Sequence, residues 1–220
     1  YLSSPDNGAH DVFHAGFLTT KPPVEQPADT FIADPLALES AQDLLKPPGD
    51  DYLVHSSEAY KANRLVYTSD PLDAPTTIAG AMNLLASISI DTPDADIGAE
   101  IDAVLPDGRT LVLGQDFVRA RFRNGTSRAE PVTAGEIEPY RFDGFYFTVR
   151  ELPKGTRLRL VLGPVNTPNL QKNYNSGGRI GYETAKDART ATITLHLDPE
   201  HASYLELPLA PTETGHEKKN

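Results

Sequence analysis

The chain has 220 residues, of which 39% are hydrophobic and 23% charged, a composition that excludes a wholly disordered protein. Its formal net charge of −11 argues against a nucleic-acid partner, and no run of Lys or Arg favours an anionic membrane surface. It has no cysteine, which excludes disulfides, thiolate nucleophiles and cysteine-based zinc sites, and no apolar run long enough to span a membrane.

The first third of the chain predicts short strands and little helix. Short strands are expected over residues 12–19 and 30–33. Leucines with helix-like spacing predict a little helix near residues 36–46. Residues 76–90, which read TTIAGAMNLLASISI, predict one long strand or a pair of strands.

A β-hairpin is predicted over residues 97–123. Residues 97–105 alternate, with Ile97, Ala99, Ile101 and Ala103 on one face. The following PDGR is a turn signal, because Asp-Gly tolerates the positive φ of a tight hairpin. The partner strand then covers residues 110–122.

Further strands are predicted over residues 138–149, 157–165, 191–197 and 204–207. In the strand over residues 157–165, Leu158 and Leu160 share one face, and Arg157 and Arg159 share the other. This alternation predicts a half-buried antiparallel strand. No strand–helix–strand alternation is present, so the fold class is all-β, a jelly-roll β-sandwich. Residues 1–210 are expected to form this domain, and residues 211–220 a polar, disordered tail.

The sequence offers no serine-hydrolase nucleophile. A nucleophile elbow needs G-x-S-x-G, and no serine stands in that pattern. Ser56 and Ser57 lie in a polar loop, while Ser87 and Ser89 fit one face of a strand. The chain alone therefore lacks a recognisable triad, and no cofactor is expected.

Histidines and acidic residues give only weak metal candidates. His10 and His14 are four residues apart but have no third ligand at a helical spacing, and His196 fits a satisfied strand histidine. Asp91, Asp94 and Asp96 cluster between two strands and are a weak calcium candidate. Their spacing departs from a calcium-binding loop, so turn chemistry is the favoured interpretation.

Residues 173–178, NYNSGG, form an unusual polar loop. Asn and Gly suit left-handed backbone conformations and a dense side-chain-to-backbone network. Two interpretations stay open for Asn173 and Asn175: a purely structural loop, or a surface that contacts another domain.

Six segments in order carry a family resemblance. They read YTSDPLDAPTTIAG from residue 67, DTPDADIGAEIDAVLPDGR from 91, FVRARFR from 117, PVTAGEIEPY from 131, LPKGTRLRL from 152 and NYNSGG from 173. Together they resemble the C-terminal domain of the X-Pro dipeptidyl-peptidase, cocaine esterase and α-amino acid ester hydrolase (CocE/NonD) family of serine hydrolases.

The resemblance implies a galactose-binding-like jelly roll that packs on a catalytic α/β-hydrolase domain of the same polypeptide. It implies that this absent domain precedes the jelly roll and carries the Ser-Asp-His triad, an expectation that fits a chain opening on Tyr1 rather than Met. The implied substrate is an ester or an X-Pro peptide, bound through the catalytic domain. Thr156 and the segment GPVNTP from residue 163 depart from the family pattern, which leaves the choice of substrate open.

The resemblance also implies that the stretch after residue 35 reaches towards the acyl pocket. Leu44 and Leu45 are the apolar pair in this polar stretch, so they are expected to face the hydrolase domain or its substrate cleft. Asn173 and Asn175 are the other candidates for a surface facing the cleft or the neighbouring domain.

Two alternative functions remain open at this stage. One is a carbohydrate-binding module, although Trp is absent and the aromatic residues from Tyr140 to Phe147 fit a strand core. The other is an oligomerisation domain that forms a homo-oligomer. The sequence leaves localisation undetermined.

Overall fold

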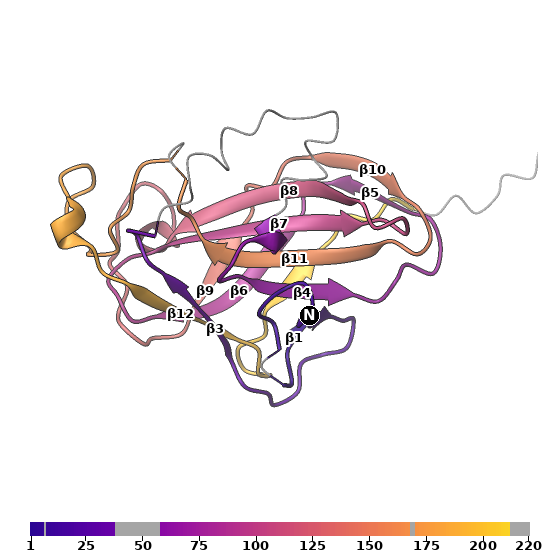
Figure 1. Cartoon of the computed structure of the whole chain (residues 1–220), viewed down its shortest axis with the longest axis horizontal. Coiled ribbons are helices and arrows are strands. Elements are labelled where there is room, and N and C mark those ends of the chain that lie inside the picture. Colours follow the sequence, from indigo (N-terminus) through magenta and orange to yellow (C-terminus); the bar gives the residue numbers. More distant parts are fainter. Residues whose placement is uncertain (7, 38–57, 168–169, 212–220) are drawn as a thin grey trace, which may run out of the picture.

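A computed structural model describes residues 1–6, 8–37, 58–167 and 170–211 of the chain. Regular structure within these ranges is almost entirely β (Figure 1). Helix is limited there to three 3₁₀ turns: Glu58–Tyr60 (η1), Ala120–Phe122 (η2) and Ala185–Asp187 (η3). The all-β prediction is confirmed, whereas most of the predicted helix near residues 36–46 lies outside the described residues.

One layer is a six-stranded sheet in the order β1-β2-β4-β11-β7-β8. Neighbouring strands are antiparallel except β2 and β4, which run parallel. The strands are Leu2–Ser3 (β1), Gly16–Leu18 (β2), Leu65–Ser69 (β4), Arg157–Pro164 (β11), Asp96–Val104 (β7) and Thr110–Arg119 (β8).

The second layer is a five-stranded antiparallel sheet centred on β6, which pairs with β9, β12 and β13, while β12 also pairs with β3. Its strands are Asp29–Ala33 (β3), Asn83–Ile90 (β6), Glu138–Phe142 (β9), Ala191–His196 (β12) and Tyr204–Glu206 (β13). A separate two-stranded sheet joins Thr76–Gly80 (β5) to Thr148–Leu152 (β10).

The core lies between the two layers. In Figure 1 the six-stranded sheet is in front, with β3, β6, β9 and β12 behind it. Alternate residues of each strand point inward, so Ile97 and Ile101 of β7 belong to the same buried cluster as Ile88 of β6 and Ile193 of β12. This arrangement is a β-sandwich with one continuous hydrophobic core.

The predicted hairpin is confirmed by its register. Pairing of β7 with β8 runs from Asp96 opposite Arg119 to Val104 opposite Thr110, with a bulge between Ile101 and Asp102. The turn works as expected, because Gly108 adopts a φ of 87° that a side chain would resist.

Two long segments are divided into separate strands. Residues 76–90, predicted as one long strand or a pair, form two strands, β5 and β6, which belong to different sheets. The prediction of one strand over residues 138–149 is wrong, because β9 ends at Phe142 and β10 begins at Thr148. Gly144 lies in the connection between these strands, where its backbone N–H donates to Asp116 Oδ2 at 2.9 Å, a close approach in which a Cβ would clash with the Asp116 carboxylate.

Burial of β11 is greater than the alternation predicts. Arg157 is exposed as expected, but Arg159 is buried beside Asp102, and Val161 is buried on the same face. The prediction of a half-buried strand is therefore wrong. The outer face of the six-stranded sheet is covered at this point, in part by Ala59 of η1, which packs with Val161.

No helix among the described residues is long and apolar enough to cross a membrane.

Candidate functional site

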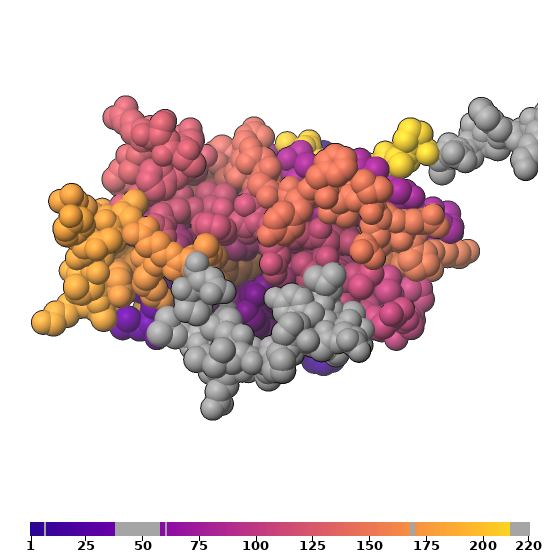
Figure 2. Space-filling view, turned by 90° about the horizontal axis from the view of Figure 1, so that it is seen from above, coloured from indigo at the N-terminus to yellow at the C-terminus, as the bar shows by residue number. Residues whose placement is uncertain are grey.

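Four segments converge at one end of the sandwich. They are the start of β7, the end of β8, the loop of residues 171–178 and the end of β3. Figure 2 shows the loop after β8, in pink, beside the region of residues 171–190, in light orange, at one end of the molecule. The two loops are in contact, because Arg121 Nη1 donates to the carbonyl oxygen of Gly178 at 2.7 Å. This end contains the acidic group and the NYNSGG loop that the sequence analysis singled out.

The first ion pair joins Arg119 to Asp96. Nε and Nη2 of Arg119 donate to the two carboxylate oxygens of Asp96, each at 2.8 Å. This two-point geometry is the strong form of an arginine–carboxylate contact. Arg119 Nη2 also donates to the carbonyl oxygen of Gln171 at 2.8 Å, so the pair holds the start of the loop in place.

The second ion pair joins Arg121 to Asp94 and is more deeply buried. Arg121 Nε donates to Asp94 Oδ2 at 2.6 Å, and the backbone N–H of Arg121 donates to Oδ1 at 2.9 Å. Burial raises the pKa of Asp94, and the hydrogen bonds and positive charge of Arg121 act in the opposite direction. Arg121 therefore compensates the cost of placing this carboxylate inside the protein.

Asn173 links the two ion pairs. Its Nδ2 donates to Asp94 Oδ2 at 2.9 Å and to Asp96 Oδ1 at 2.8 Å. Its Oδ1 accepts from the backbone N–H of Asn175 at 2.9 Å. Asn173 thus satisfies two carboxylates with one amide group, and its own orientation is fixed by the loop.

Asn175 shapes the loop from the inside. Its φ of 59° is a left-handed conformation that Asn tolerates better than most residues. Its Nδ2 donates to the carbonyl oxygens of Ala33 and Arg189, both at 3.0 Å, which connects the loop to β3. Asn173 and Asn175 are only 7% and 3% exposed, so both point inward in this domain.

The cavity beside this network is too small for a ligand. It has a volume of about 10 Å³, and its walls include Asp96, Asn173 and Asn175. That space corresponds to about one water molecule. We therefore assign the network a structural role in fixing the loops, and find no small-molecule site there.

The three aspartates of the weak calcium candidate each bond to a different protein group. Asp94 and Asp96 face arginines, and Asp91 accepts from the backbone N–H of Thr192 at 2.7 Å. Guanidinium groups occupy the positions where a cation would need free carboxylate oxygens. Within the described ranges no three His, Asp or Glu side chains gather in a way that could hold a metal ion.

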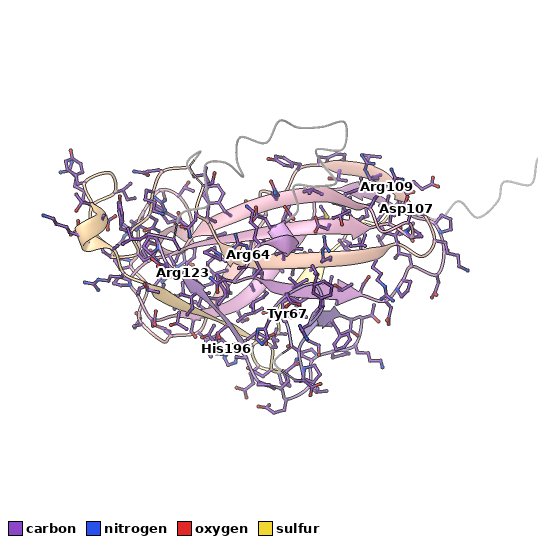
Figure 3. The ribbon with its side chains drawn as sticks, in the orientation of Figure 1. Arg64, Tyr67, Asp107, Arg109, Arg123 and His196 are labelled. Carbon is purple, nitrogen blue, oxygen red and sulfur yellow. The ribbon has the colours of Figure 1, made fainter. Side chains whose placement is uncertain are left out.

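A third arginine continues the pattern. Arg123 Nε lies 2.6 Å from Glu138 Oε2, so the alternate arginines of the FVRARFR segment each face a different carboxylate. Figure 3 shows Arg123 towards this end of the molecule and Asp107 with Arg109 at the opposite end. The alternation of arginines is visible in the sequence, but their partners are not, because Glu138 and the two Asp residues come from other segments of the chain.

Among the described residues, no serine, histidine and carboxylate assemble a triad. Ser89 Oγ lies 2.9 Å from His196 Nε2, but the neighbouring carboxylate, Asp198, bonds to His201 and not to His196. Ser89 belongs to the regular strand β6 and so lacks the strained turn of a nucleophile elbow. Ser56 and Ser57 lie outside the described residues.

His10, His14 and the aromatic stretch from Tyr140 to Phe147 have ordinary positions. His10 and His14 are both exposed, and His14 bonds to Asp11. Of the aromatic stretch expected in the core, Tyr140, Phe142 and Phe145 are buried, whereas Tyr146 and Phe147 are exposed.

Leu44 and Leu45, the apolar pair expected to face the catalytic domain, lie outside the described residues.

Comparisons with known proteins agree on one family. The model of the X-Pro dipeptidyl-peptidase C-terminal non-catalytic domain matches residues 15–206. A cocaine esterase of Rhodococcus sp. (strain MB1 Bresler) is 29% identical over 203 residues, which cover 88% of this chain and 34% of the esterase.

Solved structures with the same fold are similarly longer. An α-amino acid ester hydrolase matches with a TM-score of 0.74 at 22% identity, over 86% of this chain and 34% of its own. An aminopeptidase from a marine sediment archaeon, Thaumarchaeota archaeon, matches with a TM-score of 0.77 at 19% identity, over 96% of this chain and 36% of its own. The chain thus spans about a third of the length of these relatives.

Proposed function

This chain belongs to the family of X-Pro dipeptidyl-peptidase C-terminal non-catalytic domains, and we propose that it packs on an α/β-hydrolase catalytic domain of the same polypeptide. The observation that carries the proposal is the length relationship. The chain matches one family domain over residues 15–206 but only 34% of the curated relative. The remaining two thirds of such a polypeptide would supply the triad.

The proposed reaction is hydrolysis of an ester or of an X-Pro peptide by that catalytic domain. Such reactions pass through an acyl-serine intermediate, which requires a serine activated by a histidine and an oxyanion hole. The sequence of this chain contains no G-x-S-x-G motif, and Ser89 with His196 lacks a carboxylate that orients the histidine. These features support a non-catalytic role for this domain.

The domain would help to wall the substrate cleft through the stretch that carries Leu44 and Leu45 and through the NYNSGG loop. Since Asn173 and Asn175 are buried, they would shape that loop, and the exposed Gly178 with its neighbour Arg179 would make the contact. We further propose that residues 1–210 form the domain and residues 211–220 its tail. The comparisons do not favour a carbohydrate-binding or oligomerisation module.

The test compares the parent polypeptide with the isolated chain. The parent reading frame should encode a G-x-S-x-G followed by Asp and His upstream of Tyr1. The parent should cleave p-nitrophenyl esters or X-Pro p-nitroanilides, and the isolated chain should cleave neither. Hydrolysis by the purified isolated chain, or a parent without an upstream hydrolase domain, would overturn the proposal.

A further inference from the structure

An exposed Asn-Gly pair stands in the loop that follows β8. Asn124 and Gly125 are both exposed and lie in a turn directly after η2. Figure 2 shows this loop, in pink, projecting at one end of the molecule. The sequence has one other such pair, Asn7–Gly8, whose Asn7 lies outside the described residues. The other asparagines that the structure describes are followed by larger residues: Asn63, Asn83, Asn166, Asn173 and Asn175.

The pair carries the groups for an intramolecular reaction. The backbone nitrogen of Gly125 attacks Cγ of Asn124, so that an N–Cγ bond forms and the Cγ–Nδ2 bond breaks. Nδ2 leaves as ammonia and takes the proton of the Gly125 nitrogen with it. Water then opens the cyclic imide at one of its two carbonyl carbons, which leaves aspartate or isoaspartate at position 124. A Cβ on the second residue would hinder the attack, and glycine has none.

The surroundings of Gly125 leave room for this rearrangement. Its φ is 128°, and no described atom lies within 4 Å of the position that a Cβ would occupy. The turn lies between η2 and β9 and belongs to neither sheet, so no ladder hydrogen bond holds it. Exposed turns of this kind open locally at a small cost in free energy compared with unfolding of the domain.

Two hydrogen bonds restrain the reacting groups while the turn is closed. Asn124 Nδ2 donates to Glu130 Oε2 at 2.9 Å in an exposed contact. The N–H of Gly125 donates to the carbonyl oxygen of Phe122 at 3.0 Å. The leaving amide and the attacking nitrogen are thus both engaged, and both contacts must open before the ring can close.

We propose that Asn124–Gly125 is a site of spontaneous covalent modification, at which Asn124 converts to isoaspartate and aspartate while the domain stays folded. The contact between Asn124 and Glu130 controls the rate, because it holds the amide away from the attacking nitrogen. The reaction needs only water and the two residues themselves, so it does not depend on the presence of a catalytic domain.

The product loosens the loop locally. A carboxylate at position 124 would face the carboxylate of Glu130, and like charges repel where an amide had donated a hydrogen bond. Arg123 limits the effect, since its Nη1 donates to the carbonyl oxygens of Glu130 at 2.7 Å and of Ala120 at 3.1 Å. The loosening is therefore confined to residues 124–129, and the buried contact between Arg121 and Asp94 is kept.

Peptide mapping by mass spectrometry tests the site. The purified protein that carries this chain is incubated at mildly alkaline pH, and circular dichroism verifies that it stays folded. The peptide that contains Asn124 should gain the mass that accompanies exchange of an amide for a carboxylic acid, and it should do so before the peptides of the other described asparagines. An unmodified Asn124, or faster modification of another described asparagine, would overturn the proposal.

A matched pair of variants tests the control by Glu130. Glu130→Ala removes the tether and should accelerate modification of Asn124 by about two- to tenfold, the effect expected for one hydrogen bond. Glu136→Ala is the control, since Glu136 is an exposed carboxylate of the same loop and should leave the rate unchanged. An unchanged rate in Glu130→Ala, or equal acceleration by the two substitutions, would overturn this control.

Amide hydrogen exchange tests the consequence for the loop. Peptides covering residues 124–129 should exchange faster in the modified protein and in the Asn124→Asp variant than in the fresh protein. Peptides covering Arg121 and residues 171–178 should exchange equally in all three, because Arg121 still donates to the carbonyl oxygen of Gly178. Unchanged exchange of residues 124–129 in the modified protein, or faster exchange that includes residues 171–178, would contradict a local loosening.

Discussion

Arg121 Nε lies 2.6 Å from Asp94 Oδ2, and the two side chains are 7% and 0% exposed. Neither charge could be buried alone, because the desolvation of a single ion costs several kcal/mol. The pair joins the end of β8 to the start of β7, and Asn173 brings in the NYNSGG loop as a third segment. The loops at this end of the sandwich therefore depend on internal charge compensation.

Removal of the Arg121 charge should destabilise the domain strongly. We expect Arg121→Met to lower the free energy of unfolding by about 3–5 kcal/mol, because Asp94 is left buried without its partner. Arg109→Met is the matched control, since Arg109 pairs with Asp107 at the exposed hairpin tip and should cost at most about 1 kcal/mol. Urea unfolding followed by circular dichroism gives both values, and equal losses would contradict this account.

Two buried tyrosines should respond oppositely to the same substitution. Tyr67 Oη donates to Asp29 Oδ2 at 2.7 Å, whereas Tyr140 Oη has no hydrogen-bond partner among the described residues. We expect Tyr67→Phe to cost about 1–3 kcal/mol, because Asp29 loses a donor inside the protein. Tyr140→Phe should leave the free energy of unfolding unchanged or raise it by up to about 1 kcal/mol. Thermal melts of the two variants measure the contrast, which a comparable loss in Tyr140→Phe would refute.

The pH dependence of stability should carry a contribution from Asp29. Burial raises its pKa above the ordinary value of 3.8, and hydrogen bonds from Tyr67 and Ser4 oppose this shift only in part. Between 3.8 and the raised pKa the folded state binds more protons than the unfolded state. The contribution of Asp29 to stability is therefore greatest below pH 3.8 and is lost as the pH rises through this window.

Asp29→Asn removes this titration while keeping an acceptor and a polar group at the site. The free energy of unfolding of the wild type minus that of the variant should fall as the pH rises from 3.8. Chemical unfolding at a series of pH values measures this difference. A difference that is constant or grows with pH would show that burial does not raise the pKa of Asp29.

His196 should make the domain sensitive to mild acid. Burial, followed by the nearby His201, lowers the pKa of His196 below its ordinary value of 6.5. As the pH falls below 6.5, the unfolded state gains the proton first, so stability is lost down to the lowered pKa. His196→Gln, which keeps a hydrogen-bonding group beside Ser89, should weaken this dependence below pH 6.5, as measured by melting temperature. An unchanged slope would rule out His196 as its source.

Local signals account for the parts of the fold that the sequence predicts well. The PDGR turn and the alternation on either side of it predict the β7–β8 hairpin, because both act between neighbouring residues. The sequence does not predict β4, since residues 65–69 have no clear alternation. Val66 on its outer face is buried against Ala59 and also against Val161, which comes from a distant part of the chain.

At the candidate site, too, contacts between residues far apart in the chain cannot be predicted from local sequence signals. The sequence displays the acidic group, the alternate arginines and the Asn-rich loop, but not that they meet. Asn173 is 77 residues away from Asp96 in the chain, and only the sandwich brings them to hydrogen-bond distance.

The most direct test of the central claim, that this domain is non-catalytic, is the position of a covalent serine label. The parent polypeptide is treated with diisopropyl fluorophosphate until hydrolysis stops, and the adduct is located by peptide mass spectrometry. We expect a single labelled serine upstream of Tyr1 and no label on any serine of residues 1–220. A label on Ser89, or on any other serine of this chain, that appears in step with the loss of activity would contradict it.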